Sequence, residues 1–300
     1  MPEDRDSASR VPDPDTLLVG RYRVGRLLGR GAHGSVYLAE DYGRGGQQVA
    51  LKLVQGQADA GGWREEASLA LHWFRHPNWA DVLDAGFLEE GAWFQSLRYV
   101  RGQALNEIVE PLAPEMVWRF LEDGARVLRS LHGHGLIHYD VKPGNFILEQ
   151  TEEGPRFVLT DGGLAHIGPV EGSRRGTPLY LAPELLDEDR PDAPHDGRVD
   201  LYSLGLVAFR LATGREPFGA NENDALAHRR RHSAPRARSI HADVPEALSD
   251  VIATLLSRRP DRRPEHGGEL LQLLAEASDR DVPMLRKEEA FAAADGGCMV

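Results

Sequence analysis

The sequence predicts an α+β fold, with strands gathered in the first third of the chain and helices in the rest. From Tyr22 to Val54, β-branched and aromatic residues are broken by glycines, a pattern typical of three antiparallel strands. After Arg101 and Gly102 an amphipathic helix is expected over Met116–His132 and an apolar helix over Val199–Thr213. Three hundred residues suffice for one two-lobed domain or for two small domains with a real core.

The first half of the chain is expected to form a small sheet with one main helix. The turn at Tyr42–Gly46 separates the second strand from the third. A helix is predicted over Trp63–Phe74, where Leu69 and Trp73 lie four residues apart and therefore share one face. Two further strands are expected, around Asp81–Phe87 and Trp93–Val100.

Two shorter helices and two irregular ends complete the expected organisation. The helices are predicted over Leu248–Leu256 and Leu270–Ala277, and no internal repeat is visible. Residues 1–20 hold three prolines and many charges, so we expect a disordered N-terminal arm. Residues 278–300 are expected to form a flexible C-terminal tail.

The formal charge of -12 limits the classes of partner. Nucleic acids and anionic membranes both favour a basic surface, so neither is expected as a general partner. One basic cluster lies between two helical stretches of the second half: Arg229, Arg230, Arg231 and His232, with Arg236 and Arg238 nearby. We expect this cluster to be a solvated loop, and a docking site for an acidic substrate or partner is the alternative.

Cysteine usage and the apolar runs indicate a soluble cytoplasmic protein. Cys298 is the one cysteine, so no intramolecular disulfide can form, which fits a reducing compartment. The acidic N-terminus does not have the apolar core of a signal peptide. No apolar run approaches the ~18 residues of a membrane span.

The strongest chemical signal is a short polar segment that holds Asp140, Lys142 and Asn145, followed after a strand by Asp161. Phosphoryl transfer needs a carboxylate to take a hydroxyl proton, a cation on the transferring group and oxygen ligands for Mg²⁺. An Asx-rich turn without chemistry is the alternative. Apolar residues on both sides are expected to form short buried strands: Leu136 and Ile137 before the segment, Phe146 to Leu148 after it.

This segment resembles the catalytic loop of the eukaryotic-type (Hanks-type) protein kinases, and further motifs follow in that family's order. They are a glycine-rich loop at 29–36 (GRGAHGSV), a lysine strand at 49–52 (VALK), Asp161-Gly162-Gly163 where the family has Asp-Phe-Gly, Ala182-Pro183-Glu184, and the large-lobe anchors Asp200 and Arg263. The resemblance covers 21–277. It implies the bilobal kinase fold, with an N-lobe over 21–101 and a mostly helical C-lobe over 102–277.

The glycines of the loop have more than one interpretation. G-x-G-x-x-G also occurs in Rossmann folds, where it leads into a helix, whereas here it leads into the strand-like residues 35–38. Glycines at a strand turn let backbone N–H groups approach phosphates, and an ordinary hairpin is the alternative. The resemblance assigns five residues of this region to ATP binding: Gly29, Gly31, Gly34, Val36 and Ala50.

Lys52 follows three apolar residues, so its stem is expected to be buried and its charge to need a partner. The resemblance implies that Glu66 is this partner and that the pair holds the α- and β-phosphates, with the adjacent Glu65 left as the alternative. It also places Leu97 at the gatekeeper position and Val100 at the hinge, where backbone meets the adenine of ATP.

The resemblance gives each residue of the polar segment a role. Asp140 would accept the proton of the substrate hydroxyl, and Lys142 would neutralise charge on the transferring phosphoryl group. Asn145 and Asp161 would hold Mg²⁺ through oxygen, which suits a hard cation. Lys142 together with the sequence Gly-Thr-Pro-Leu-Tyr at 176–180 resembles the serine/threonine branch of the family.

Two anchors are expected to be structural, and two positions depart from the family pattern. Glu184 and Arg263 would form a buried ion pair, and Asp200 would bond the catalytic-loop backbone or act as an ordinary N-cap.

Tyr139 replaces the arginine that binds a phosphorylated activation loop, so such phosphorylation is not expected to be needed. Gly162 replaces a phenylalanine that packs between the lobes, and Trp73 or Phe74 is expected to fill its space.

The expected function is therefore that of a cytoplasmic, soluble protein serine/threonine kinase of the bacterial Hanks type, dependent on ATP and Mg²⁺. Protein substrates with Ser or Thr acceptors are the expected partners, and autophosphorylation is possible. A pseudokinase scaffold is the first alternative, although Lys52, Asp140 and Asp161 are all present. A small-molecule phosphotransferase is the second, but such enzymes lack the Gly-Thr-Pro and Ala-Pro-Glu segment.

Overall fold

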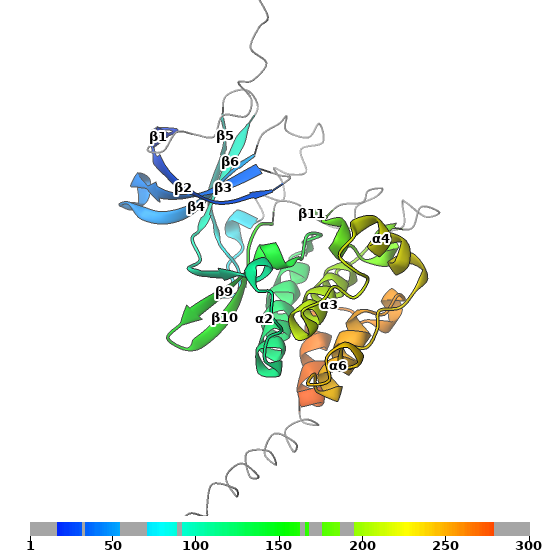
Figure 1. The fold of residues 1–300 in the computed structure, drawn as a ribbon. Coiled ribbons are helices and arrows are strands. Elements are labelled where there is room, and N and C mark those ends of the chain that lie inside the picture. The colour runs from blue at the N-terminus through cyan, green and yellow to red at the C-terminus, as the bar shows by residue number, and fades with distance from the viewer. Residues whose placement is uncertain are drawn as a thin grey trace, which may run out of the picture.

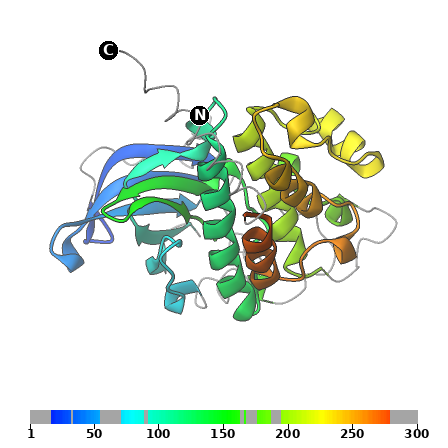
Figure 2. The same cartoon turned by 90° about the horizontal axis from the view of Figure 1, so that it is seen from below.

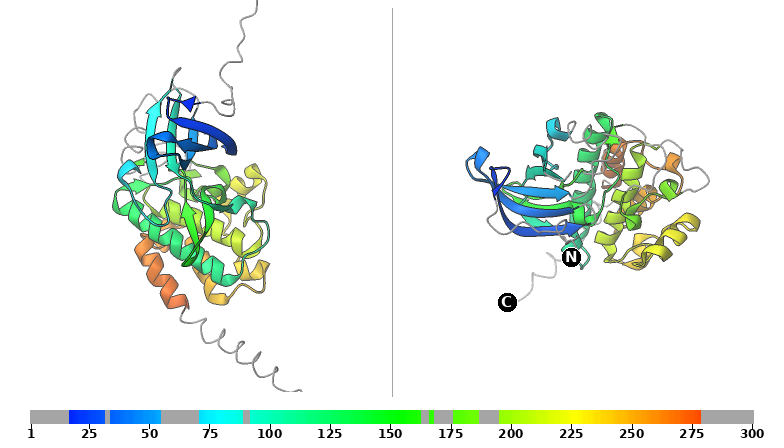
Figure 3. Two further views of the ribbon diagram at one scale, coloured as in Figure 1. Left: turned by 90° about the vertical axis from the view of Figure 1, so that its left-hand side faces the viewer. Right: turned by 90° about the horizontal axis from the view of Figure 1, so that it is seen from above.

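The chain folds into a lobe built around a sheet and a lobe built mainly from helices (Figure 1). The computed structural model describes residues 17–31, 34–54, 71–88, 92–162, 166–167, 176–186 and 195–278. Views from other sides show the same division, with the strands of the first lobe in one body and the helices in the other (Figures 2 and 3).

The described strands of the first lobe form an antiparallel sheet in the order β1-β2-β3-β4-β6-β5. Alternate residues of the strands are buried, such as Tyr37 and Ala39 on β3 and Val49 and Leu51 on β4, because one face of the sheet carries the core of this lobe. The strands are β1 (Leu17–Leu18), β2 (Tyr22–Gly31), β3 (Gly34–Asp41), β4 (Gln47–Val54), β5 (Val82–Phe87) and β6 (Trp93–Arg98). The five strands expected from the sequence are confirmed as β2 to β6.

The turn between β3 and β4 is a short 3₁₀ turn, Tyr42–Arg44, whose start is held by Asp41. The Asp41 carboxylate accepts a hydrogen bond from the backbone N–H of Gly43 at 2.9 Å and is gripped by both ends of the Arg21 guanidinium at 2.6 and 2.8 Å. This bidentate pair holds the pKa of the buried Asp41 carboxyl below its ordinary value. The charged residues therefore fix the turn that separates the two strands.

The helix expected over Trp63–Phe74 falls mostly outside the described residues, which include its end over 71–73. Leu71 and Phe74 are buried there, whereas Trp73 is 79% exposed. The expectation that Trp73 belongs to the apolar face is therefore wrong. The buried side chains at this helix end are those of Leu71 and Phe74 instead.

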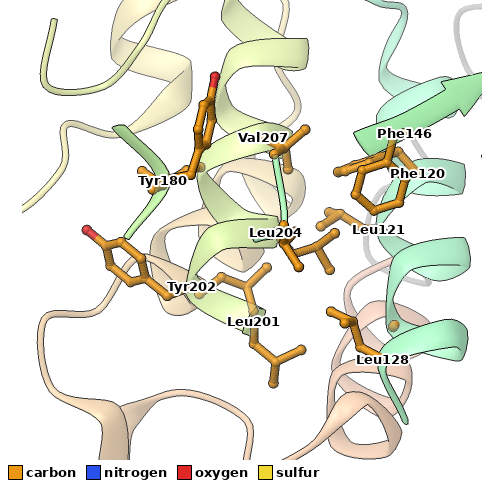
Figure 4. Close-up of a cluster of buried hydrophobic side chains, with 14 of the residues drawn as sticks. Phe120, Leu121, Leu128, Phe146, Tyr180, Leu201, Tyr202, Leu204 and Val207 are labelled. Atoms are coloured by element: carbon orange, nitrogen blue, oxygen red, sulfur yellow. The ribbon is translucent and has the colours of Figure 1, made fainter. Parts of the chain in front are cut away.

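The second lobe is organised around two long helices, α2 (Pro114–Gly133) and α3 (Arg198–Thr213). Phe120, Leu121 and Leu128 of α2 point toward Leu201 and Leu204 of α3, and their side chains meet between the two helices (Figure 4). α3 is buried on nearly all sides, as its apolar sequence predicted, because it passes through the middle of the lobe.

The remaining described elements surround this pair. The helices are α4 (Glu222–Arg231), α5 (Ala237–Ile240), α6 (Glu246–Leu255) and a helical stretch over 267–278. The strands are β7 (Gly102–Ala104), β8 (Leu136–Ile137), β9 (Phe146–Thr151), β10 (Gly154–Leu159) and β11 (His166–Ile167), which pair as β10-β9-β7 and as β11-β8. Short 3₁₀ turns lie at Leu105–Glu107, Pro143–Asn145, Pro178–Tyr180, Pro183–Leu186 and Pro260–Arg262.

The hairpin of β9 and β10 is fastened to α2. Phe120 of α2 packs edge-on against Phe146 and Phe157, with ring centroids 5.0 and 5.4 Å apart. The backbone N–H of Phe157 also donates to the Asp123 carboxylate of α2 at 2.9 Å. The hairpin matters for the site because the polar segment enters it at Phe146 and Asp161 follows its end.

The basic cluster is largely exposed, as the sequence suggested, but its first three arginines lie on α4 rather than in a loop, and one of them is buried. Arg229 lies in the last turn of α4, and its side chain is buried. The guanidinium donates to the backbone carbonyls of Pro178, Leu179 and Leu181, and it lies 5.3 Å from the ring of Phe218. These carbonyls belong to the 3₁₀ turn Pro178–Tyr180 and to the residue that follows it, and buried carbonyls need donors, so the role of Arg229 is structural.

Candidate active site

The polar segment is held in place by Asp200, which lies near the start of α3. Its carboxylate accepts hydrogen bonds from the backbone N–H groups of His138 and Tyr139, both at 2.8 Å. His132 Nε2 lies 2.9 Å from the same carboxylate. Tyr139 adopts a left-handed backbone with φ 61°, so the loop turns sharply just before Asp140. The expected bonding of Asp200 to the loop backbone is confirmed.

The charge of Asp200 is stabilised although the residue is completely buried. Burial acts to raise the pKa of this carboxyl, but the hydrogen bond and charge of His132 and the backbone N–H of His138 together lower the pKa below its ordinary value. For His138 itself, burial lowers the pKa and keeps the ring neutral. Its Nδ1 accepts the backbone N–H of Asp140 at 3.2 Å, so the ring supports the next residue of the loop.

Asp140 is the centre of a compact set of polar contacts and is 4% exposed. Its Oδ2 lies 2.6 Å from Lys142 Nζ and accepts a hydrogen bond from Asn145 Nδ2 at 3.1 Å. Its Oδ1 accepts hydrogen bonds from the hydroxyl of Thr177 at 2.7 Å and from the Thr177 backbone N–H at 3.1 Å. Lys142 Nζ also donates to the Thr177 hydroxyl at 2.9 Å, so carboxylate, ammonium and hydroxyl form a closed triangle.

Lys52 reaches this region from the sheet of the first lobe. It lies on β4, is 3% exposed, and its Nζ forms an ion pair with Asp161 Oδ1. Its stem is buried and its charge is paired, as expected for a lysine in this position. The partner in the structure is Asp161, whereas Glu66, expected from the resemblance, and its alternative Glu65 lie outside the described residues.

The two expected metal ligands lie near each other. Asn145 uses its Nδ2 for hydrogen bonds to the backbone carbonyl and the carboxylate of Asp140, so its side-chain oxygen can serve as a ligand. The Thr160 backbone N–H, next to Asp161, donates to the Asn145 carbonyl at 2.7 Å and ties the two segments together. An amide oxygen and a carboxylate are donors that fit a hard divalent cation.

Most of these groups line one cleft of about 730 Å³ between the lobes; Asp140 does not line it but is bonded to Lys142, Asn145 and Thr177, which do. Of the residues predicted from the sequence, the following line it: Gly29, Gly31, Gly34, Val36, Lys52, Lys142, Asn145 and Asp161. Gly34 has φ 132°, and a Cβ there would lie 2.1 Å from the backbone oxygen of Leu53. The loop can therefore lie this close to β4 because residue 34 is glycine.

Of the residues expected near an adenine ring, Ala50 and Leu97 lie on β4 and β6, and Val100 follows the end of β6. Ala50 of β4 is the register partner of Leu97 on β6, so the two residues lie side by side in the sheet. Leu97 and Val100 are both buried. Their assignment to the gatekeeper and hinge positions stays a prediction.

Comparison with known proteins gives this geometry a family context. The sequence matches the protein kinase domain over residues 22–274. The chain belongs to the protein kinase family. It is 37% identical over 279 residues to the DNA damage-responsive serine/threonine-protein kinase RqkA of Deinococcus radiodurans, which covers 87% of this chain and 40% of that protein.

Two further relatives are also named serine/threonine-protein kinases. Pkn3 of Myxococcus xanthus is 32% identical over 85% of this chain and 50% of its own length. PknB of Mycolicibacterium smegmatis is 31% identical over 89% of this chain and 44% of its own length. The chain thus spans half or less of the length of these curated relatives. In its described residues, no helix combines the length and the apolar character needed to cross a bilayer.

The second structural anchor of this kinase domain is also where the sequence placed it. Arg263 donates two hydrogen bonds to the Glu184 carboxylate, at 2.6 and 2.8 Å. The same guanidinium donates to the backbone carbonyls of Ser257 and Arg198. The arginine is buried and bonded through all three of its nitrogens, so the pair joins the end of the activation segment to the base of the helical lobe.

The space at Gly162 is filled, but not by the residue first expected. A Cβ on Gly162 would lie 2.5 Å from Leu71 Cδ1 and 3.0 Å from Trp79 Cη2. Trp73 is exposed and cannot fill the space. Phe74 instead packs edge-on against Trp79, with ring centroids 5.7 Å apart. The expected compensation by a large side chain is present, and the side chain is that of Trp79.

One network in the cleft had no signal in the sequence. The Tyr180 hydroxyl donates to Glu216 Oε1 at 2.6 Å, and Arg210 Nε lies 3.4 Å from the same oxygen. Burial raises the pKa of both Tyr180 and Glu216. Arg210 and Glu216 flank the end of α3 and line the cleft together with Lys142 and Asn145. Their spacing along the chain matches no motif, so folding was needed to bring them together.

Proposed function

We propose that this chain is a protein serine/threonine kinase that transfers the γ-phosphoryl group of ATP to Ser and Thr hydroxyls with Mg²⁺ as cofactor. The observation that supports this best is the triangle of Asp140, Lys142 and Thr177. In it a carboxylate accepts a hydrogen bond from a threonine hydroxyl at 2.7 Å while an ammonium group lies within 2.9 Å of both. The cleft above it is open to the glycine loop.

Each residue would act through the atoms that the cleft presents. Asp140 accepts the proton of the incoming hydroxyl, and Lys142 offsets negative charge on the transferring group. Lys52 binds phosphate oxygens from the side of the sheet, and Gly29, Gly31 and Gly34 allow the backbone to cover them. Asn145 and Asp161 would hold Mg²⁺, which when bound supplies charge neutralisation between the phosphates.

The partners and compartment follow from composition and from the cleft. We propose that the substrates are proteins, including further copies of this chain, because the segment from Thr177 to Glu184 packs beside the catalytic loop where a peptide would bind. A formal charge of -12 supports a partner other than nucleic acid or an anionic membrane. The single cysteine supports a reducing compartment such as the cytoplasm.

The test is phosphoryl transfer by the purified chain. Labelled ATP, Mg²⁺ and a generic basic protein should yield phosphoserine or phosphothreonine in the wild-type protein. The variant Asp140→Asn should keep ATP binding, measured by thermal shift, and lose roughly 10²- to 10⁴-fold in transfer rate. Transfer at the wild-type rate in this variant would contradict the assignment, and ATP binding without transfer in the wild type would favour the pseudokinase scaffold.

A further inference from the structure

Trp79 occupies a position from which it contacts three parts of the site at once. The residue is completely buried, in the segment between the helix end at 71–73 and strand β5. Its ring lies edge-on to the imidazole of His138 in the catalytic loop, with centroids 6.0 Å apart and an interplanar angle of 84°. It also lies edge-on to Phe74 at 5.7 Å and reaches the backbone of Gly162.

The contact at Gly162 leaves no room for a side chain on that residue. A Cβ built there would approach Leu71 Cδ1 to 2.5 Å, closer than real Cβ contacts come, and Trp79 Cη2 to 3.0 Å, tighter than most of them. The backbone that follows Asp161 therefore rests directly on the indole and the leucine. In this chain Leu71 and Trp79, which lie outside the segment, supply the bulk beside Gly162, the residue that follows Asp161.

The backbone around Trp79 is fastened to the strand that leads into Asp161. The Leu159 N–H donates to the Asn78 carbonyl at 2.9 Å, and the Ala80 N–H donates to the Leu159 carbonyl at 3.0 Å. Asn78 Nδ2 donates to the Phe157 carbonyl at 3.0 Å, also on β10. The indole is thus fixed relative to β10, two residues before Asp161, and cannot shift without breaking these bonds.

We propose that Trp79 is the positioning residue that sets the Asp161 carboxylate opposite Lys52, taking from another part of the chain the place that a side chain at residue 162 would fill. This inference rests on the proposed function for its activity readout. Without the indole, Gly162 gains space, and the segment that carries Asp161 can retreat from Lys52. The aromatic contact with His138 also links the Trp79 indole to the loop that carries Asp140.

The experiment is a reciprocal exchange between the two positions. Trp79→Leu should lower kcat per folded molecule about 10- to 100-fold, since displacement of a catalytic group by about 1 Å costs on that order. Gly162→Phe alone should lose activity as well, because its ring collides with Trp79 and Leu71. The double variant, Trp79→Leu with Gly162→Phe, should recover to within a few-fold of wild type, because the space left by the indole takes the phenyl ring and lets the flexible end of the Leu71 side chain turn aside.

Two matched variants separate positioning from general packing. Trp79→Phe keeps an aromatic ring and should keep most of the activity. Trp73→Leu makes the same change as Trp79→Leu at an exposed site near the same helix end, and should leave kcat and stability unchanged. Equal losses for Trp73→Leu and Trp79→Leu, or a double variant no better than the worse single variant, would overturn the proposal.

A second readout does not depend on catalysis. The wild type, Trp79→Leu, Gly162→Phe and the double variant are unfolded in urea. The coupling free energy between positions 79 and 162 is taken from this double-mutant cycle. A clearly favourable coupling supports direct contact, and additive effects refute it. The fluorescence of Trp79, isolated as the difference between wild type and Trp79→Phe, should change on adding Mg²⁺ and ATP. If the wild type shows no transfer, the proposed function fails, while the coupling and fluorescence still decide the role of Trp79.

Discussion

Replacing Asp200 by asparagine tests whether one buried carboxylate fixes the catalytic loop. The carboxylate accepts N–H groups from His138 and Tyr139 at 2.8 Å each and contacts His132 at 2.9 Å. Asparagine keeps the shape but offers one acceptor oxygen, so its amide group must face a backbone N–H or the histidine. The change therefore removes at least one bond to a charged group and leaves a buried donor without a partner.

The magnitude follows from these two losses. A hydrogen bond to a charged group contributes about 1.5–3 kcal/mol, and a buried donor left unpaired costs about 1–3 kcal/mol. We expect Asp200→Asn to lower the free energy of unfolding by about 3–5 kcal/mol, a large part of the ~5–15 kcal/mol of a typical domain. Transfer activity per folded molecule should fall as well, because Asp140 follows the two anchored N–H groups directly.

Urea unfolding and the transfer rate at a temperature where both proteins are folded are the two assays. The pKa of the Asp200 carboxyl is lowered, so the carboxylate is ionised at neutral pH, where the stability difference is measured. Asp196→Asn is the matched control, since Asp196 accepts the backbone N–H of Arg198 at 2.9 Å at an exposed site just before α3. Similar effects of the two substitutions would refute the reasoning and reduce Asp200 to an ordinary helix cap.

Three further expectations can be checked with the same purified protein. Lys52→Met should abolish most transfer while the fold is retained, because the ion pair with Asp161 is lost; wild-type kcat/KM in this variant would exclude a role for the lysine. Arg229→Met should lower the free energy of unfolding by about 2–4 kcal/mol, since it leaves buried carbonyls without donors, whereas the exposed Arg231→Met should change it little. Burial lowers the pKa of His138 below its unfolded value of 6.5, so the unfolded state binds more protons below that pH and stability should fall in acid. His138→Gln should flatten this part of the pH–stability profile, and an unchanged slope would show that another group causes it.

The local sequence carried much of the fold and of the site. Alternating apolar residues and glycine turns predicted strands β2 to β6, and helical spacing predicted α2, α3 and α6, because both patterns depend on neighbours close in the chain. Asp140, Lys142 and Asn145 could be read as one site because they lie within a few residues of each other. The family resemblance then joined them to Lys52 and Asp161, which the structure brings to the same cleft.

Contacts between distant segments decided the rest. Arg229 looked like part of a charged surface loop, and only its hydrogen bonds to the carbonyls of Pro178, Leu179 and Leu181 gave it a buried role. The space beside Gly162 was assigned to Trp73 or Phe74, whereas Leu71 and Trp79 border it, because helical periodicity describes the faces of one helix and cannot show which neighbouring segment packs there. Trp79 reaches that space through hydrogen bonds between residues 78–80 and β10, segments far apart in the sequence. Residue type and spacing thus specify which chemical groups the chain carries, whereas packing in three dimensions specifies which of them meet.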